Sequence, residues 1–93
     1  IPLDPMTNQM VVDYYVVQTT RVLENLRILL ESEGLDLAHV VKTTIFMIDL
    51  SEFAKLNKIY ADFFTHDYPS RSTVQVAALP MGARVEIEAI AHY

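Results

Sequence analysis

Hydrophobic and polar residues alternate with helical periodicity in the first half of this chain. In "DYYVVQTTRVLENLRILLESEG", residues 13–34, apolar side chains recur at the three-four spacing of an amphipathic helix. Asp13 is a suitable N-cap for this helix, and Gly34 suits the left-handed conformation that ends many helices. We expect its buried face to consist of Thr19, Val22, Leu23, Leu26, Leu29 and Leu30.

The segment "SEFAKLNKIYADFFTH", residues 51–66, has the same helical periodicity of apolar residues. Ser51 is the expected cap of this second helix. Asn57 interrupts the apolar pattern, and we expect it to form a solvent or cap-like hydrogen bond rather than to reach a ligand. The expected buried face consists of Phe53, Leu56, Tyr60, Phe63 and Phe64.

Three other segments have the patterns of strands. "HVVKTTIFMIDL" is rich in β-branched residues and apolar on both faces, which predicts a strand covered on both sides. "PSRSTVQVAAL" and "ARVEIEAIAHY" are two further predicted strands, joined by the turn "PMG". The order helix, strand, helix, strand, strand predicts an α+β sandwich with both helices on one face of the sheet. Before these elements, "IPLDPMTNQMV" is predicted to be an extended arm followed by a turn.

Strand alternation also separates candidate functional side chains from core side chains. Arg71 and Thr73 point to one side of their strand and Val74 to the other. Because the helices should cover the apolar side, we expect Arg71 to share the opposite face with Glu86 and Glu88. The strand at residues 39–50 is apolar on both sides, so this second face is expected to lie against a partner.

Composition supports one small domain that associates with other copies. The chain has 93 residues, and 52% of them are hydrophobic, more than one small copy can bury well. The net charge is −5 and the cations are scattered, which disfavours nucleic-acid binding. No apolar run approaches the ~20 residues that span a bilayer. Cysteine is absent, which excludes disulfides and thiolate metal sites and is consistent with a reducing compartment such as the cytoplasm.

Arg71 and Glu86 are the strongest candidates for chemistry. The planar guanidinium of arginine matches a carboxylate with two hydrogen bonds, and a nearby carboxylate can orient a water molecule or transfer a proton. The alternative is a cross-strand salt bridge, worth ~0–1 kcal/mol where exposed, and spacing alone favours this alternative. Glu88 is a competing carboxylate on the same face, for which a solvated or interface position is favoured.

Other reactive side chains lack the spacing that catalysis or metal binding requires. His39, His66 and His92 lie in three different elements without a metal-ligand pattern, so no metal site is predicted. The hydroxyls beside Arg71 have no evident His–Asp relay, which disfavours a serine-hydrolase triad. Only two glycines are present, and no glycine-rich phosphate cradle exists.

Three blocks of sequence resemble one known family. "VVKTTIFMIDLSEFAKLNKIYADFF", "YPSRSTVQVAALP" and "VEIEAIA", in this order and spacing, are similar to the reactive intermediate deaminase A family, also called RidA/YjgF. "IPLDP" and "QTTRVLENLRILLESEGL" are similar to its earlier segments, so the resemblance covers essentially all 93 residues.

This resemblance implies a chorismate-mutase-like α+β fold with a mixed sheet, assembled as a homotrimer with clefts between subunits. It implies an enzyme, a 2-iminobutanoate/2-iminopropanoate deaminase, which hydrolyses 2-imino acids or their enamine tautomers to 2-keto acids and ammonia. No cofactor, nucleic acid or membrane is expected to take part. The alternative is a non-catalytic trimer that binds small carboxylates or has a regulatory or chaperone-like role, and nuclease activity gains no support from an acidic chain.

The resemblance also assigns site residues. Arg71 matches the family arginine that binds the substrate carboxylate, and Glu86 matches the glutamate near the attacking water. Thr73 occupies a position that is often cysteine in the family, where the main-chain N–H also contacts the carboxylate. Asn57 aligns with a frequent asparagine near the cleft. Family members carry further residues before "IPLDP", so residues 1–93 are expected to form a single domain without the family's N-terminal strands, and a targeting segment ahead of it stays an open alternative.

Overall fold

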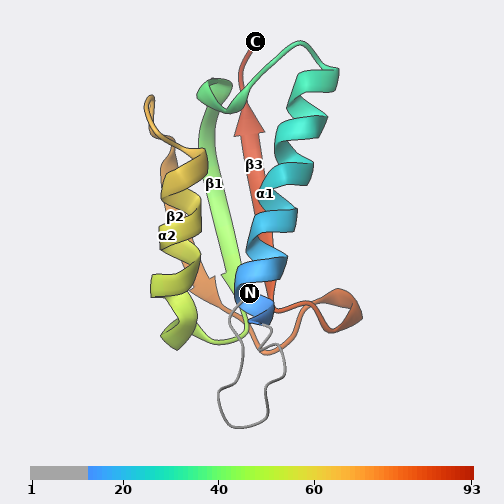
Figure 1. Ribbon diagram of the computed structural model, residues 1–93, viewed down its shortest axis with the longest axis vertical. Coiled ribbons are helices and arrows are strands. Elements are labelled where there is room, and N and C mark those ends of the chain that lie inside the picture. The colour runs from blue at the N-terminus through green and yellow to red at the C-terminus, as the bar shows by residue number, and fades with distance from the viewer. Residues whose placement is uncertain (1–12) are drawn as a thin grey trace, which may run out of the picture.

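The computed structural model describes residues 13–93, which form one sheet covered on one face by two helices (Figure 1). The predicted α+β class and the order of elements are confirmed. The arm predicted for residues 1–11 lies outside the described residues. The elements are α1 (Tyr14–Ser32), β1 (Val40–Met47), α2 (Phe53–Phe63), β2 (Ser70–Gln75) and β3 (Val85–Ala91).

The ends of α1 follow from its capping residues, as predicted. The Asp13 side chain accepts hydrogen bonds from the backbone N–H groups of Tyr15, at 3.0 Å, and Val16, at 3.3 Å. Just beyond the last turn, Gly34 adopts φ +73°, a conformation that costs glycine little. Of the predicted face, Thr19, Leu23 and Leu30 are buried, whereas Leu29 is exposed, because it lies a further 100° around the helix from the buried stripe.

Helix α2 begins differently from the prediction. A single 3₁₀ turn, Leu50–Glu52, precedes it, and the Asp49 carboxylate caps that turn. Asp49 accepts hydrogen bonds from both the backbone N–H of Ser51, at 3.0 Å, and its hydroxyl, at 2.7 Å. The prediction of Ser51 as the cap is therefore wrong, because the carboxylate two residues earlier is the acceptor. The predicted buried side chains Leu56, Tyr60 and Phe64 are confirmed as core residues.

The sheet is mixed, with β1 in the centre. Its strand order is β2-β1-β3, with β1 parallel to β2 and antiparallel to β3. Parallel neighbours need a crossover connection, and α2 supplies it between β1 and β2. In Figure 1, α2 lies over the β2 side of the sheet and α1 over the β3 side. The core between these layers is formed by Tyr15, Leu23, Leu30, Val40, Ile45, Met47, Leu56, Tyr60, Phe64 and Val85.

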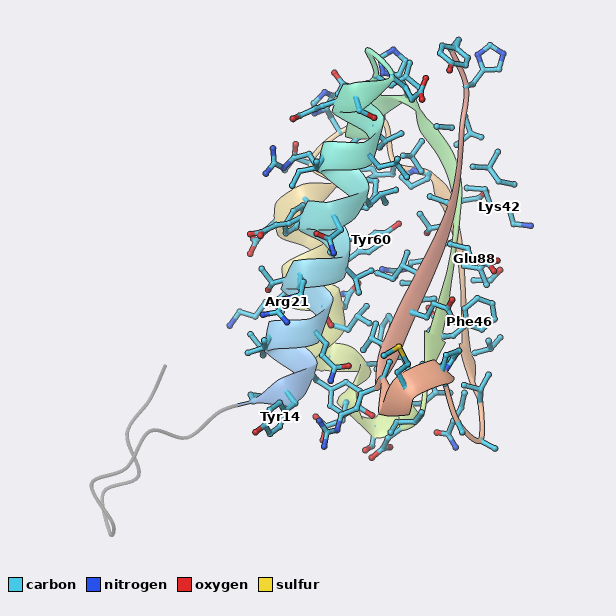
Figure 2. The ribbon with its side chains drawn as sticks, turned by 90° about the vertical axis from the view of Figure 1, so that its right-hand side faces the viewer. Tyr14, Arg21, Lys42, Phe46, Tyr60 and Glu88 are labelled. Atoms are coloured by element: carbon cyan, nitrogen blue, oxygen red, sulfur yellow. The ribbon has the colours of Figure 1, made fainter. Side chains whose placement is uncertain are left out.

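The second face of the sheet is open in this chain, and Figure 2 shows Lys42, Phe46 and Glu88 on the side away from the helices. Val41 and Lys42 are exposed there, and Phe46 is half-buried. Within residues 13–93, only the helix-facing side of β1 is buried, and the cover of its other side by a partner stays a prediction. Ile90, on the same open face, is 59% exposed. Among residues 13–93, neither helix combines the length and apolar character needed to cross a bilayer.

An ion-pair network joins the starts of the two helices. The Lys55 ammonium lies 2.9 Å from the Asp13 carboxylate and 2.8 Å from the Glu52 carboxylate. The hydrogen bond from Lys55 is the main reason that the pKa of Asp13 lies below its usual value. Asp13 thus caps α1, and in its charged form it also forms an ion pair with Lys55 of α2.

We therefore expect acid to destabilise the fold partly through Asp13. Because its pKa is lowered in the folded state, its stabilisation is complete above the unfolded pKa of about 3.9 and is lost as pH falls through the folded pKa. The slope of thermal midpoint against pH between about 5 and 3 should be shallower in Asp13→Asn, which keeps a capping oxygen without the charge. Asp13→Ala should also lose about 1 kcal/mol of cap stabilisation at pH 7. Equal slopes for wild type and Asp13→Asn would contradict this role.

Candidate functional site

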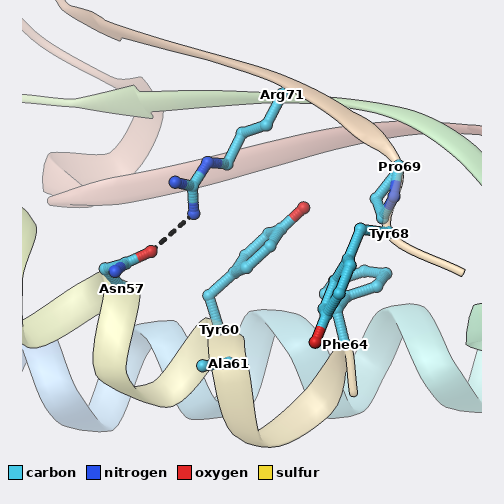
Figure 3. A pocket seen from close by; sticks show the side chains of 7 residues that line it. All are labelled: Asn57, Tyr60, Ala61, Phe64, Tyr68, Pro69 and Arg71. Carbon is cyan, nitrogen blue, oxygen red and sulfur yellow. Dashed lines mark hydrogen bonds between the residues drawn. The ribbon is translucent and has the colours of Figure 1, made fainter. Parts of the chain in front are cut away.

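A pocket opens between α2, the loop that follows it, and the start of β2 (Figure 3). It has a volume of about 460 Å³, within the size range of small-molecule sites. Its walls come from α2 and β2. These two elements lie together because β2 pairs in parallel with β1, and α2 is the connection between the two strands. The lining residues are Asn57, Tyr60, Ala61, Phe64, Tyr68, Pro69 and Arg71.

Arg71 is the cation of this pocket. Its guanidinium donates a 2.6 Å hydrogen bond to the side-chain oxygen of Asn57. The guanidinium carbon lies 4.9 Å from the ring centre of Tyr60 and 5.2 Å from that of Phe53, distances at which a cation is attracted to an aromatic face. Among residues 13–93, Arg71 forms no ion pair with a carboxylate. Its remaining N–H donors can therefore bind a carboxylate brought by a ligand.

Tyr60 forms the floor beneath Arg71 and is fixed from two sides. Its hydroxyl shares a buried 2.8 Å hydrogen bond with the Thr43 hydroxyl on β1. Its ring stacks on Phe64, with 4.5 Å between ring centres and 29° between planes. The apolar pattern of the sequence predicts Tyr60 as a buried core residue but does not reveal its contact with Arg71. The available signal was its spacing of three residues from Asn57, which puts both on one face of a helix.

The orientation of Arg71 differs from the prediction. Arg71 pairs with Thr43, and Thr43 faces the helices, so Arg71 also points toward the helix side. The expectation that it shares a face with Glu86 and Glu88 is wrong. A cation can occupy this side because β2 is an edge strand, and the aromatic rings of α2 accept the flat guanidinium.

Glu86 and Glu88 lie on the open face of β3, opposite Phe46 and Thr44 of β1. Since β1 lies between β2 and β3, Arg71 and Glu86 are not on neighbouring strands. The cross-strand salt bridge considered for this pair is therefore excluded, and the two side chains of one chain face opposite sides of the sheet. Glu86 is exposed and borders a smaller hollow of about 220 Å³ with Leu79 and Pro80.

The remaining candidates divide into two groups. Thr73 is half-buried on the helix side of β2, next but one to Arg71, and a main-chain contact from it to a ligand stays a prediction. The histidines serve local structure: the ring of His39, for example, accepts a hydrogen bond from the Asp36 backbone in a capping box. Within residues 13–93, no three acidic or histidine side chains gather closely enough to ligate a metal ion.

The hydroxyl pair beneath the pocket leads to a stability prediction. Thr43→Val or Tyr60→Phe alone leaves one buried hydroxyl without a partner and should lower the free energy of unfolding by about 1–3 kcal/mol. The double variant removes both hydroxyls, so its loss should be smaller than the sum of the two single losses. Urea unfolding of the four proteins measures this difference, and strictly additive losses would show that the hydroxyls are not coupled.

Comparisons with known proteins agree with this architecture. The family model described as Endoribonuclease L-PSP matches residues 1–93. The chain is 54% identical to Protein DfrA of Myxococcus xanthus, over 98% of this chain and 70% of that protein. It is 44% identical to the mouse protein named 2-iminobutanoate/2-iminopropanoate deaminase, over 98% of this chain and 67% of the relative.

A solved structure extends the agreement to three dimensions. The crystal structure of E. coli TdcF with bound serine superposes with a TM-score of 0.77 at 41% identity, covering 98% of this chain and 73% of that chain. The matching blocks include the pocket segment and the strand that bears Glu86, because nearly the whole chain is aligned. This chain therefore belongs to the Endoribonuclease L-PSP family, the RidA/YjgF family that its sequence motifs resemble.

Proposed function

We propose that this protein hydrolyses 2-imino acids, or their enamine tautomers, to 2-keto acids and ammonia without a cofactor. The observation that supports this most directly is the guanidinium of Arg71, which is positioned by Asn57 and Tyr60 at the edge of a pocket and has no carboxylate partner among residues 13–93. Such a group binds the carboxylate that every 2-imino acid carries.

The relatives support the same class of ligand. Curated relatives from mouse and human, at 44% and 40% identity, are named 2-iminobutanoate/2-iminopropanoate deaminase. The E. coli relative is described with bound serine, a small amino acid with the same carboxylate.

We infer that the protein acts in the cytoplasm, a reducing compartment that suits a chain whose sequence contains no cysteine.

We further propose that the complete site forms between two copies of the chain in a homotrimer. Within one copy, Arg71 faces the helices and Glu86 faces the open side of the sheet, so one copy cannot place both beside a single small ligand. The open face carries exposed apolar side chains, including Val41 and Ile90, of the kind that subunit interfaces bury. Glu86 of one copy would then complete the pocket around Arg71 of the next.

The proposed reaction needs only positioning and proton transfer. Arg71 binds the substrate carboxylate and so fixes the adjacent C=N carbon in the pocket. Water oriented by Glu86 adds to that carbon of the N-protonated imine, while one proton of the water passes to the carboxylate of Glu86. This addition gives a neutral amino alcohol, and Glu86 then returns its proton to the nitrogen. The C–N bond breaks as the hydroxyl becomes the keto C=O, and the hydroxyl proton passes by way of Glu86 to the departing ammonia. The products are a 2-keto acid and ammonia.

Replacement of Arg71 tests the central assignment. Arg71→Ala should lower kcat/KM for 2-iminobutanoate by at least about 100-fold, because the substrate loses its charged anchor and its orientation. The imine is generated in the assay by a threonine dehydratase, and 2-oxobutanoate formation is followed with and without the protein.

Arg84→Ala is a matched control, because Arg84 also lies over an aromatic ring, 4.8 Å from the centre of Tyr14, but away from the pocket. It should keep wild-type activity. Undiminished activity of Arg71→Ala would reject the assignment. If wild type leaves the rate unchanged but binds 2-oxobutanoate, the protein is instead a non-catalytic carboxylate-binding protein.

Mixing two inactive variants tests the shared site. Arg71→Ala and Glu86→Gln should each be inactive alone, but co-refolded at equal amounts they should recover about a quarter of wild-type activity. Random assembly places an intact Arg71 beside an intact Glu86 of a neighbour at about one interface in four. Mass measurement of the native assembly verifies that mixing occurred. If both side chains acted within one copy, mixed assemblies would be no more active than either variant alone.

A further inference from the structure

The pocket has two chemically different ends. Asn57 and Arg71 form a polar, cationic end, joined by their 2.6 Å hydrogen bond. The other lining residues are aromatic or apolar, and Figure 3 shows Phe64, Tyr68 and Pro69 gathered at the end away from Asn57. When the carboxylate of a ligand binds Arg71, the side chain of that ligand can therefore lie against the apolar part of the pocket lining.

This apolar floor is longer than a small imino acid requires. Asn57, Ala61 and Phe64 lie on one face of the α2 segment, and a rise of 1.5 Å per residue makes the floor from Asn57 to Phe64 about 10 Å long. A four-carbon imino acid has about seven non-hydrogen atoms, and at ~30 Å³ each it fills less than half of the 460 Å³ pocket. The lining beyond Asn57 and Arg71 includes the rings of Tyr60, Phe64 and Tyr68.

Tyr68 closes the far end of this floor. Like Phe64, it lines the pocket, and its hydroxyl donates a 3.1 Å hydrogen bond to the Thr65 carbonyl, which ties the side chain to its own loop. Asp67, the preceding residue, adopts φ +53°, a conformation that residues other than glycine rarely adopt. Tyr68 is nevertheless 74% exposed, so its ring has a large apolar surface available to a ligand.

Within one copy, the lining contains no charge besides Arg71, and the Glu86 that a neighbouring copy is proposed to add would lie around Arg71, at the polar end. A ligand side chain with its own charge would lose water at the aromatic end without gaining an ionic partner there. A long apolar or aromatic side chain instead buries apolar surface against Phe64 and Tyr68.

We propose that the pocket selects 2-imino acids with long apolar or aromatic side chains over short ones, and that Tyr68 is the specificity-determining residue. This rests on the proposed function, because the carboxylate must first bind Arg71. The substrate side chain then runs along α2 toward the Tyr68 ring.

The test compares two imino acids made by one L-amino-acid oxidase, from phenylalanine and from 2-aminobutanoate. Imine decay is followed by semicarbazide capture. For wild type, kcat/KM should be at least about 10-fold higher for the phenylalanine-derived imine. Tyr68→Ala should lower that value about 10-fold and change the value for 2-iminobutanoate less than about two-fold. Tyr68→Phe keeps the ring and should keep the preference.

Tyr93→Ala, which removes another exposed tyrosine, serves as the control and should match wild type on both substrates. Equal or greater activity on 2-iminobutanoate in wild type, or an equal loss on both substrates in Tyr68→Ala, would overturn the selectivity. If neither imine is hydrolysed faster, the proposed function fails. Calorimetric titration then tests the proposed selectivity separately. The selectivity is supported if wild type binds phenylpyruvate more tightly than 2-oxobutanoate and Tyr68→Ala does not. Any other result rejects it.

Discussion

The register of β2 against β1 is the constraint on which the pocket depends. It places Arg71 beside Thr43, on the side of the sheet that the helices cover. Because successive strand side chains face opposite ways, a slip of one residue would turn Arg71 to the open face and away from Asn57 and Tyr60. Parallel pairing of these strands also requires a crossover, and that crossover is α2. The same connection that allows the pairing therefore supplies the floor of the pocket.

The core and the pocket meet at Tyr60. One end of this side chain satisfies the buried Thr43 hydroxyl, and its ring packs against both Phe64 and the guanidinium of Arg71. A buried hydroxyl pair is favourable only when both members are satisfied, which restricts the ring to one position. Arg71 consequently meets a rigid surface, and little ordering is left for a ligand to impose.

The local pattern of apolar and polar residues predicted the helices and the strands, and the capping residues Asp13 and Gly34 predicted the ends of α1. Each of these features depends on residues close in sequence. The local pattern could not predict which polar face would meet the helices. Alternation separates Arg71 from Val74, but the choice between the two faces is made by strand order and register, which join residues far apart in the chain. At Ser51 the local pattern also misled, since the Asp49 carboxylate upstream accepts hydrogen bonds from both the N–H and the hydroxyl of Ser51 and caps the turn instead. Side-chain chemistry made Arg71 and Glu86 candidates, and the family motifs gave them and Asn57 their expected roles. Their arrangement in space came from the fold alone.

The pocket is encoded almost entirely by one uninterrupted stretch, from Asn57 to Arg71. The loop within it, residues 65–69, connects α2 to an edge strand and carries no sheet pairing of its own. Natural variation or engineering can therefore lengthen, shorten or exchange this loop without disturbing the core. In evolutionary terms, the loop that lines the pocket can diversify while the scaffold beneath it stays unchanged.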